Sequence, residues 1–411
     1  MIAGSEPKIT ILEPVGNGRE WQKSERTFDT PYLTDRDLTG LPKRCYIFLD
    51  ARNYPPEDGR REGLLAHFNV PPFLATRTCF EINGYFGSKV RYDDSQRITS
   101  YSTWFRFLLK MVRKANDPHE DGPEYATGTK NYQWFETTFF TRWEGSESCQ
   151  VLCVDTPPDF PDGVLEQLHR QNSPLDFKDP FALHASIVDQ LIVHYDVSVW
   201  RVRDPVRQLE KTRMRAGAIF NPIHEMSRHA IHKSEVLEAA IETLKEMQRC
   251  RTEIHERMRS ELDETHRDQC KQYGQFQVTI LSNLKLRADS NQERLKDEID
   301  LAFNTLSRQD NNIMTSITLL TILFFPATFV ATFFSTTFFT FAEDGSWAMN
   351  DMHWLYWATT IPATIVVLSA WYLWLTYSDA ILNFLEACWK RPLVMWTRAT
   401  ALKEKKVVEK A

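Results

Sequence analysis

Hydroxyl side chains are regularly spaced along a charge-free apolar stretch near the C-terminal end of this 411-residue chain. No charged residue occurs between residues 311 and 342. Within that stretch, polar residues follow alternating steps of three and four, and only Phe325 in the series is apolar; the others are Thr318, Thr321, Thr328, Thr332 and Ser335, which we call the hydroxyl stripe. Such steps place side chains on one face of a helix. Rings of neutral oxygens can bind a hydrated cation, so the spacing favours a pore face.

Two interpretations of the hydroxyl stripe stay open. Ser and Thr are also common where two membrane helices pack together, so the stripe could be a helix interface. The same spacing continues toward the N-terminus through Met314 and Asn311, which favours a pore. Phe325 would then form a hydrophobic constriction and act as a gate. A pore of this kind needs several chains around a symmetry axis, because two helices cannot enclose one.

Two apolar runs are long enough to cross a bilayer, which takes about 20 residues in a helix. We expect transmembrane helix 1 over 311–341, an extracytoplasmic loop over 342–353, transmembrane helix 2 over 354–377 and a basic cytoplasmic tail over 378–411. The loop carries no Lys or Arg, so the positive-inside bias predicts that both termini are cytoplasmic. The loop acids Glu343, Asp344 and Asp351 either concentrate cations at a pore mouth or are simply solvated.

The remainder of the chain has the composition of a soluble protein. A quarter of all residues are charged and the net charge is −6, which gives no sign of nucleic-acid binding. We expect a polar N-terminal segment over 1–43, loosely ordered over 1–40, and a cytosolic α/β domain over 44–180. Buried strands are predicted at 45–49, 137–143 and 150–154, while 101–112 fits a strand or a helix, and 155–163 a loop.

A helical region with a long stalk helix is expected over 181–310. Apolar spacing predicts helices at about 182–203, at about 224–266, and from about 268 into the first apolar run. Pro205 is expected to end the first of these helices. No Pro or Gly interrupts residues 275–325, so the third helix is expected to be continuous up to the hydroxyl stripe.

Other chemistry-bearing residues give weaker signals. His224, His229 and His232 lie near a helix start, but no Cys or paired acid completes a zinc set, so solvated or capping histidines are expected. Cys149 and Cys153 share a strand face and are expected to be buried core thiols. The seven cysteines are dispersed and odd in number, which suits free thiols in a reducing compartment. No phosphate-binding loop, nucleophile elbow or other catalytic motif is present, so no enzyme is predicted.

Residues 311–338 resemble the first transmembrane helix of CorA-type divalent-cation channels, whose Pro-x-Thr-Phe motif reads here Pro326-Ala327-Thr328-Phe329. The helical region of a divergent, fungal-type branch is similar to residues 184–235, which contain Tyr195-Asp196-x-Ser198-Val199-Trp200 and His224-Glu225-x-x-Arg228-His229. The resemblance covers roughly residues 180–378. By position, the family's pore-lining residues fall on Asn311, Met314, Ile317, Phe325, Thr328 and Thr332. The family's Gly-Met-Asn mouth falls on Ser335, Thr336 and Thr337, which retain none of its residues.

The resemblance implies a cytosolic α/β domain, a long stalk helix and two C-terminal transmembrane helices, assembled as a homopentamer in a lipid bilayer. It implies passive flux of a divalent cation, magnesium first, with zinc, cobalt or nickel as further candidates. No cofactor is expected besides the transported cation, which could also regulate the gate at Phe325 through the stalk. The plasma membrane is expected rather than an organelle. A non-conducting receptor or scaffold that has lost the filter stays open, as does, less favoured, a membrane-anchored enzyme.

Overall fold

The structure, a computed structural model, describes residues 8–335 apart from 17, 28–34, 51–59, 113–131, 172 and 213–219, and scattered residues between 339 and 369. The chain divides into two compact units, Met1–Gln309 and Asp310–Ala411. Each unit is therefore described by itself. The expected basic tail at 378–411 and most of 354–377 lie outside the described residues.

The first unit is built on a seven-stranded sheet with the order β2-β1-β3-β7-β6-β5-β4. Only β3 and β7 pair in parallel within this sheet, and its other neighbours are antiparallel. Its strands are β1 Lys8–Val15, β2 Glu20–Thr27, β3 Arg44–Leu49, β4 Gly84–Tyr92, β5 Ile98–Val112, β6 Tyr132–Glu144 and β7 Ser148–Val154. The strands expected at 45–49, 137–143 and 150–154 are thus confirmed, and 101–112 is a strand.

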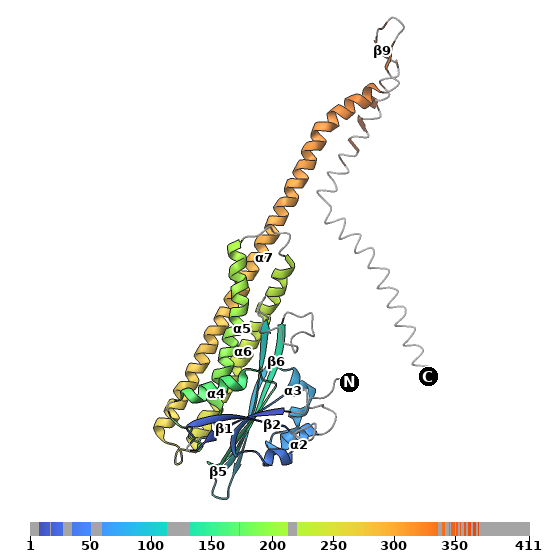
Figure 1. The fold of residues 1–411 in the computed structure, drawn as a ribbon. Coiled ribbons are helices and arrows are strands. Elements are labelled where there is room, and N and C mark those ends of the chain that lie inside the picture. Colours follow the sequence, from blue (N-terminus) through green and yellow to red (C-terminus); the bar gives the residue numbers. More distant parts are fainter. Residues whose placement is uncertain are drawn as a thin grey trace, which may run out of the picture. The chain divides into compact units, whose positions relative to one another are not determined.

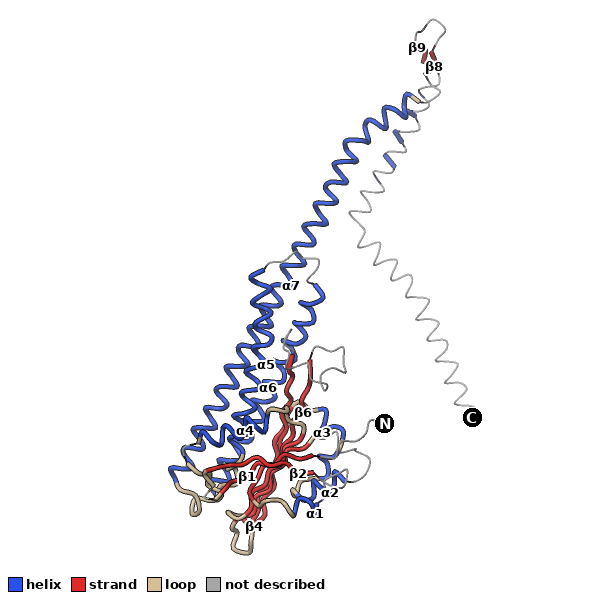
Figure 2. Tube along the Cα trace, in the orientation of Figure 1, coloured by secondary structure: helices blue, strands red, loops and turns tan. Residues whose placement is uncertain are grey.

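Helices cover both faces of the sheet (Figures 1 and 2). They are α1 Asp35–Thr39, α2 Arg60–His67, the 3-10 helix η3 Pro72–Ala75, α3 Arg77–Glu81, α4 Phe160–Arg170, α5 His184–Thr212, α6 Phe220–Arg257 and α7 Glu264–Phe334. One apolar core joins the sheet to α1–α3 through residues such as Ile47 and Leu65. A larger core joins the opposite face to α4–α7 through residues such as Phe105, Leu191 and Leu284. The predicted α/β domain is confirmed.

The expectation that residues 1–40 are loosely ordered is wrong for β1 and β2, and residues 1–7, 17 and 28–34 lie outside the described residues. Strand β1 pairs with β2 on one side and with β3 on the other. Ile9 and Ile11 alternate with Thr10 and are buried, which fixes the register of β1 against the sheet. Gly16 and Gly18 have positive φ in the turn between β1 and β2, where a residue with a Cβ would be strained. The expected loop over 155–163 is also too long, because α4 begins at Phe160.

Two predicted helix ends are wrong. Helix α5 does not stop before Pro205 but continues to Thr212. Val202 and Val206, one turn apart, are buried with Ile223 and Leu295, and this packing holds the helix through the proline. Helix α6 ends at Arg257, not near His266, and a short turn leads to α7. The continuity of α7 is confirmed, because its 71 residues run through Gly274 and Pro326 without a break.

In the second unit, the expected transmembrane helix 1 over 311–341 is too long at its C-terminal end. Helix α7 ends at Phe334, and β8 Phe339–Phe341 pairs with β9 Trp347–Met349 in an antiparallel hairpin. Aromatic and β-branched residues favour extended backbone, which accounts for the early end. The rings of Phe333 and Trp357 lie 5.8 Å apart, so the chain beyond the hairpin returns to the end of α7. Among the described residues, no helix has both the length and the apolar character that a membrane crossing requires.

Candidate pore face

Helix α7 carries the hydroxyl stripe as far as Thr332, and Ser335 lies in the turn just after the helix. All five stripe residues are exposed. Four of the hydroxyls donate to the carbonyl one turn earlier in the same helix: Thr318 to Met314 at 2.8 Å, Thr321 to Ile317 at 2.9 Å, Thr328 to Phe324 at 2.8 Å and Thr332 to Thr328 at 2.7 Å. The proton of each of these four hydroxyls is therefore already donated to the backbone of the same helix.

This bonding pattern decides what the stripe can offer to another molecule. A hydroxyl has one proton to donate and two lone pairs that accept. Once the proton is bonded inside the helix, the oxygen presents only acceptor capacity to the outside. Water molecules in the shell of a cation point their hydrogens outward, so a row of neutral acceptors matches them. Neutral oxygens bind weakly enough to release the ion again, which conduction requires.

The structure describes the side chains of some of the other expected pore residues on α7. Met314 and Ile317 are 65% and 54% exposed, and Asn311 is exposed as well. Phe325, the expected gate, lies in α7, but its side chain is outside the described residues. Large apolar side chains are exposed on the rest of this helix surface, including Leu319 at 65% and Leu320 at 55%. Exposed apolar side chains in such number indicate a surface that another chain or lipid covers.

The expected mouth is described only in part. Ser335 is exposed, and Thr336 and Thr337 lie outside the described residues. Of the loop acids, Asp351 is exposed just after β9, and Glu343 and Asp344 lie outside the described residues. Gly345, which lies between β8 and β9 in the sequence, has φ of 77°.

Within the described part of the chain, the histidines near the start of α6 do not gather with other ligands into a group that could hold a metal ion. His229 is buried against the ring of Tyr132 at 5.2 Å, so the expectation of a solvated or capping histidine is wrong for this residue. Lys110 Nζ lies 2.7 Å from His232 Nδ1, so the lone pair of this nitrogen is already engaged by a positive side chain. Burial, with neighbouring Arg228, lowers the pKa of Lys110 to about 8, and burial lowers the pKa of His229 to about 4. The positive side chains exclude a cation here.

The cysteines of β7 behave as expected. Cys149 and Cys153 are fully buried in the larger core, and burial raises the pKa of both thiols far above the ordinary value.

A different cluster, Asp179, His266 and Cys270, was missed by sequence reasoning. Its one local signal is the four-residue spacing of His266 and Cys270, which places both on one face of α7.

Comparison with known proteins gives the family. The profile of the family described as CorA-like Mg2+ transporter protein matches residues 153–376, more than half of the chain. A curated relative, "Notoamide biosynthesis cluster protein M'" of Aspergillus versicolor, is 29% identical over 302 residues, which cover 64% of this chain and 61% of that protein. The match therefore spans about three fifths of that relative's length.

One solved structure agrees at the level of the fold, and a second covers the same share of the chain. The structure of the full-length CmaX protein superposes with a TM-score of 0.50 at 13% identity, covering 90% of this chain and 98% of that chain. The CorA magnesium transporter from Methanocaldococcus jannaschii gives a TM-score of 0.48 at 11% identity, with the same coverage of both chains. Because the profile matches residues 153–376, more than half of the chain, the chain belongs to the CorA-like Mg2+ transporter family.

Proposed function

We propose that this protein forms a membrane pore that passes divalent cations down their gradient, magnesium first. The pore is lined by α7 from Asn311 to Thr332, with one copy of that helix from each subunit. Zinc, cobalt and nickel are the other candidate ions. We assign no enzymatic role to residues 44–180 and no cofactor other than the cation itself, which could also act as a regulator.

One observation carries the proposal, namely the inward-bonded hydroxyls of the exposed stripe. Thr318, Thr321, Thr328 and Thr332 present acceptor oxygens along one side of a helix within the family-matched region. Thr315 and Ser316 bond their hydroxyls in the same way, so the proposal depends on the spacing that places these four oxygens on one side of α7. Family membership supports cation transport as the general activity.

The proposed assembly is a homopentamer in a lipid bilayer. The apolar side chains exposed around the stripe, such as Leu319 and Leu320, would then face the second helix, a neighbouring subunit or lipid. The contact between Phe333 and Trp357 supports packing of the returning segment, 354–377, against the end of α7. Both termini are proposed to be cytoplasmic, and the membrane is proposed to be the plasma membrane.

Within this pore, Phe325 is the proposed gate, and Ser335, Thr336 and Thr337 form the outer filter. The filter replaces the family's carboxamide with hydroxyls, which are shorter and offer other donor and acceptor sets. Glu343, Asp344 and Asp351 would concentrate cations at the mouth.

The same three filter positions support a second candidate, a non-conducting receptor or scaffold with this architecture. The curated relative is named for a biosynthesis cluster and not for transport. The two candidates share the fold and the oligomer and differ in flux alone.

Ion uptake by reconstituted vesicles tests the proposal. The full chain is purified in detergent, its oligomeric mass is measured, and it is placed in vesicles that contain a magnesium-sensitive dye. We expect a pentamer and magnesium entry well above empty vesicles, with cobalt and nickel compared in parallel. An intact oligomer without flux of any of these ions would support the scaffold, and a monomer or dimer would exclude the pore.

A further inference from the structure

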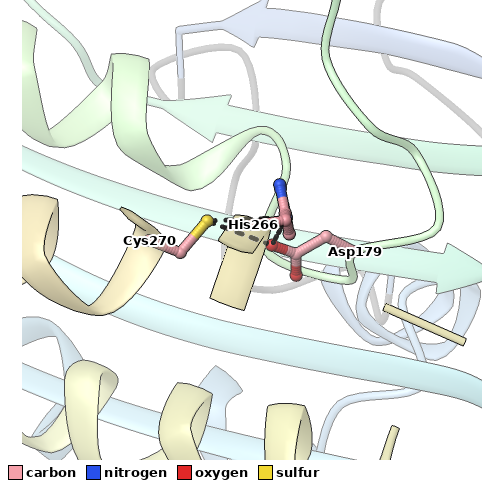
Figure 3. A group of neighbouring side chains, drawn as sticks. All are labelled: Asp179, His266 and Cys270. Carbon is pink, nitrogen blue, oxygen red and sulfur yellow. Dashed lines mark hydrogen bonds and ion pairs between the residues drawn. The ribbon is translucent and has the colours of Figure 1, made fainter. Parts of the chain in front are cut away.

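Three potential metal ligands converge in the first unit, at the start of α7 (Figure 3). The Oδ2 atom of Asp179 lies 3.1 Å from His266 Nε2 and 3.8 Å from Cys270 Sγ. The third distance, between Cys270 Sγ and His266 Nε2, is 3.5 Å. The three donor atoms therefore form a small triangle.

The fold brings these residues together from distant parts of the chain. Asp179 lies in the turn before α5, and its Oδ1 accepts hydrogen bonds from the backbone N–H of Phe181 at 2.8 Å and from His255 of α6 at 3.0 Å. His266 and Cys270 follow one another by one turn in α7. Since α6 and α7 are joined by a short turn, His255 and His266 approach the same carboxylate from two helices.

The triangle has the dimensions of one face of a tetrahedral zinc site. Zinc holds oxygen and nitrogen at about 2.0–2.1 Å and sulfur at about 2.3 Å, so its donors stand about 3.3–3.7 Å apart. The observed separations of 3.1, 3.5 and 3.8 Å bracket that range. Binding would need a shift of only a few tenths of an ångström by each donor.

The donor types select the class of metal. A thiolate, an imidazole and a carboxylate together suit zinc and similar borderline ions. Magnesium prefers an all-oxygen octahedron and would find one oxygen here. Asp179 is almost fully buried, while His266 and Cys270 are partly exposed, so water and metal can reach the triangle from outside.

We propose that Asp179, His266 and Cys270 bind a zinc-type divalent cation, with water as the fourth ligand. His255 orients the carboxylate through the oxygen that faces away from the metal, as hydrogen-bonded partners of metal ligands commonly do. The metal ties the turn before α5 to the first turns of α7. This site is independent of the proposed pore, because none of its ligands lies on the hydroxyl stripe.

The competing arrangement is a metal-free hydrogen-bond cluster. In that case a proton stays on His266 Nε2 and bonds to Asp179, and the cysteine remains a thiol. Arg251, buried nearby, interacts electrostatically with both Asp179 and Cys270, and its charge opposes a cation. The two arrangements differ in whether a metal–sulfur bond forms, and this difference can be measured directly.

Cobalt is the probe, because a cobalt–thiolate bond absorbs in the near ultraviolet and a tetrahedral cobalt site has intense visible bands. The full chain in detergent is stripped of metal and titrated with Co2+. We expect one thiolate-bound cobalt per chain, displaced by an equivalent of Zn2+ and not by a large excess of Mg2+. Cys270→Ser is expected to abolish the thiolate absorption.

Cys250→Ser is the matched control, because Cys250 is also a partly exposed helical thiol but lies outside the triangle. This variant is expected to retain the full cobalt signal. Absence of thiolate absorption in the unmutated protein would overturn the proposal without any variant. Equal signals in Cys270→Ser and the unmutated protein, or displacement of cobalt by Mg2+, would overturn it as well. None of these outcomes depends on vesicle flux, so the site and the pore are tested separately.

Discussion

Replacing Thr328 by Val tests whether the hydroxyl stripe faces the path of the ion. The two side chains have the same branched shape, and the substitution exchanges one hydroxyl for a methyl group. In the helix, the Thr328 hydroxyl donates to the Phe324 carbonyl at 2.8 Å. That carbonyl keeps its backbone partner within the helix, so the cost to the fold is small. The change removes an outward acceptor oxygen from each subunit.

The size of the effect follows from the hydrogen bonds that are lost. One hydrogen bond contributes about 1 kcal/mol net, and more when a charged group polarises it. A hydrated cation that touches two hydroxyls of the Thr328 ring would lose about 2 kcal/mol of stabilisation. Since about 1.4 kcal/mol corresponds to a tenfold change in rate, we expect magnesium flux to fall about 30-fold.

Ser316→Ala is the control for this prediction. The Ser316 hydroxyl also donates to a carbonyl one turn earlier, that of Asn312 at 2.8 Å, but it lies on the opposite side of α7. Both variants are reconstituted at equal protein density after their oligomeric mass has been compared, and magnesium entry is followed by dye fluorescence. Unchanged flux in Thr328→Val would refute the assignment of this face to the pore, as would equal losses in the two variants.

Three further predictions concern the first unit. Arg106 is 2% exposed and its guanidinium donates to the carbonyls of Phe80 and Ile82. Arg106→Met removes both half-buried hydrogen bonds and is expected to lower the unfolding free energy by about 2 kcal/mol in denaturant titration. Burial, and secondarily the positive charge of Arg251, lowers the pKa of His184 to about 3, so the unfolded chain takes up a proton below about pH 6.5 and the folded one does not. The contribution of neutral His184 to the free energy of unfolding is therefore fully present above that pH and falls by about 1 kcal/mol per pH unit as the pH drops toward the folded pKa. His184→Gln is expected to flatten this slope in unfolding curves recorded from pH 7 to pH 5. A Cβ at Gly84 would lie 2.6 Å from Thr243 Oγ1, so Gly84→Ala is expected to cost about 1–3 kcal/mol in thermal unfolding, and adding Thr243→Ala is expected to restore part of that loss.

Local sequence patterns were sufficient to predict the strands and helices that are determined by their own residues. The apolar run at the start of β3 and the uninterrupted sequence before Phe325 were sufficient to place a strand and a long helix. Strand β2 was missed because seven of its eight residues are not buried, so it carries no hydrophobic alternation of its own. Its place is set by pairing with β1, and β1 in turn by pairing with β3. The prediction that α5 ends before Pro205 was wrong because the packing of Val206 outweighs the local tendency of proline to end a helix.

The same distinction holds for the sites. The hydroxyl stripe was visible because its members repeat within one helix. Asp179 lies 91 residues from Cys270, and nothing in the intervening sequence indicates that they meet. Their approach depends on the turn between α6 and α7 and on close packing there, since a Cβ at Gly274 would collide with Gln248. Contacts of this kind follow from the whole fold and cannot be derived from spacing.

The inward bonding of the four threonine hydroxyls has a consequence for the sign of the ion. An anion is solvated by hydrogens, and Thr318, Thr321, Thr328 and Thr332 have already committed theirs to the helix backbone. A bare chloride ion would therefore find no donor in this row, whereas a hydrated metal ion would bond through the outward hydrogens of its shell. In the proposed pore, the described part of the row would favour a cation over a bare anion without a single formal charge. Discrimination of this kind would not weaken at high ionic strength, because it depends on the direction of hydrogen bonds and not on a screened field.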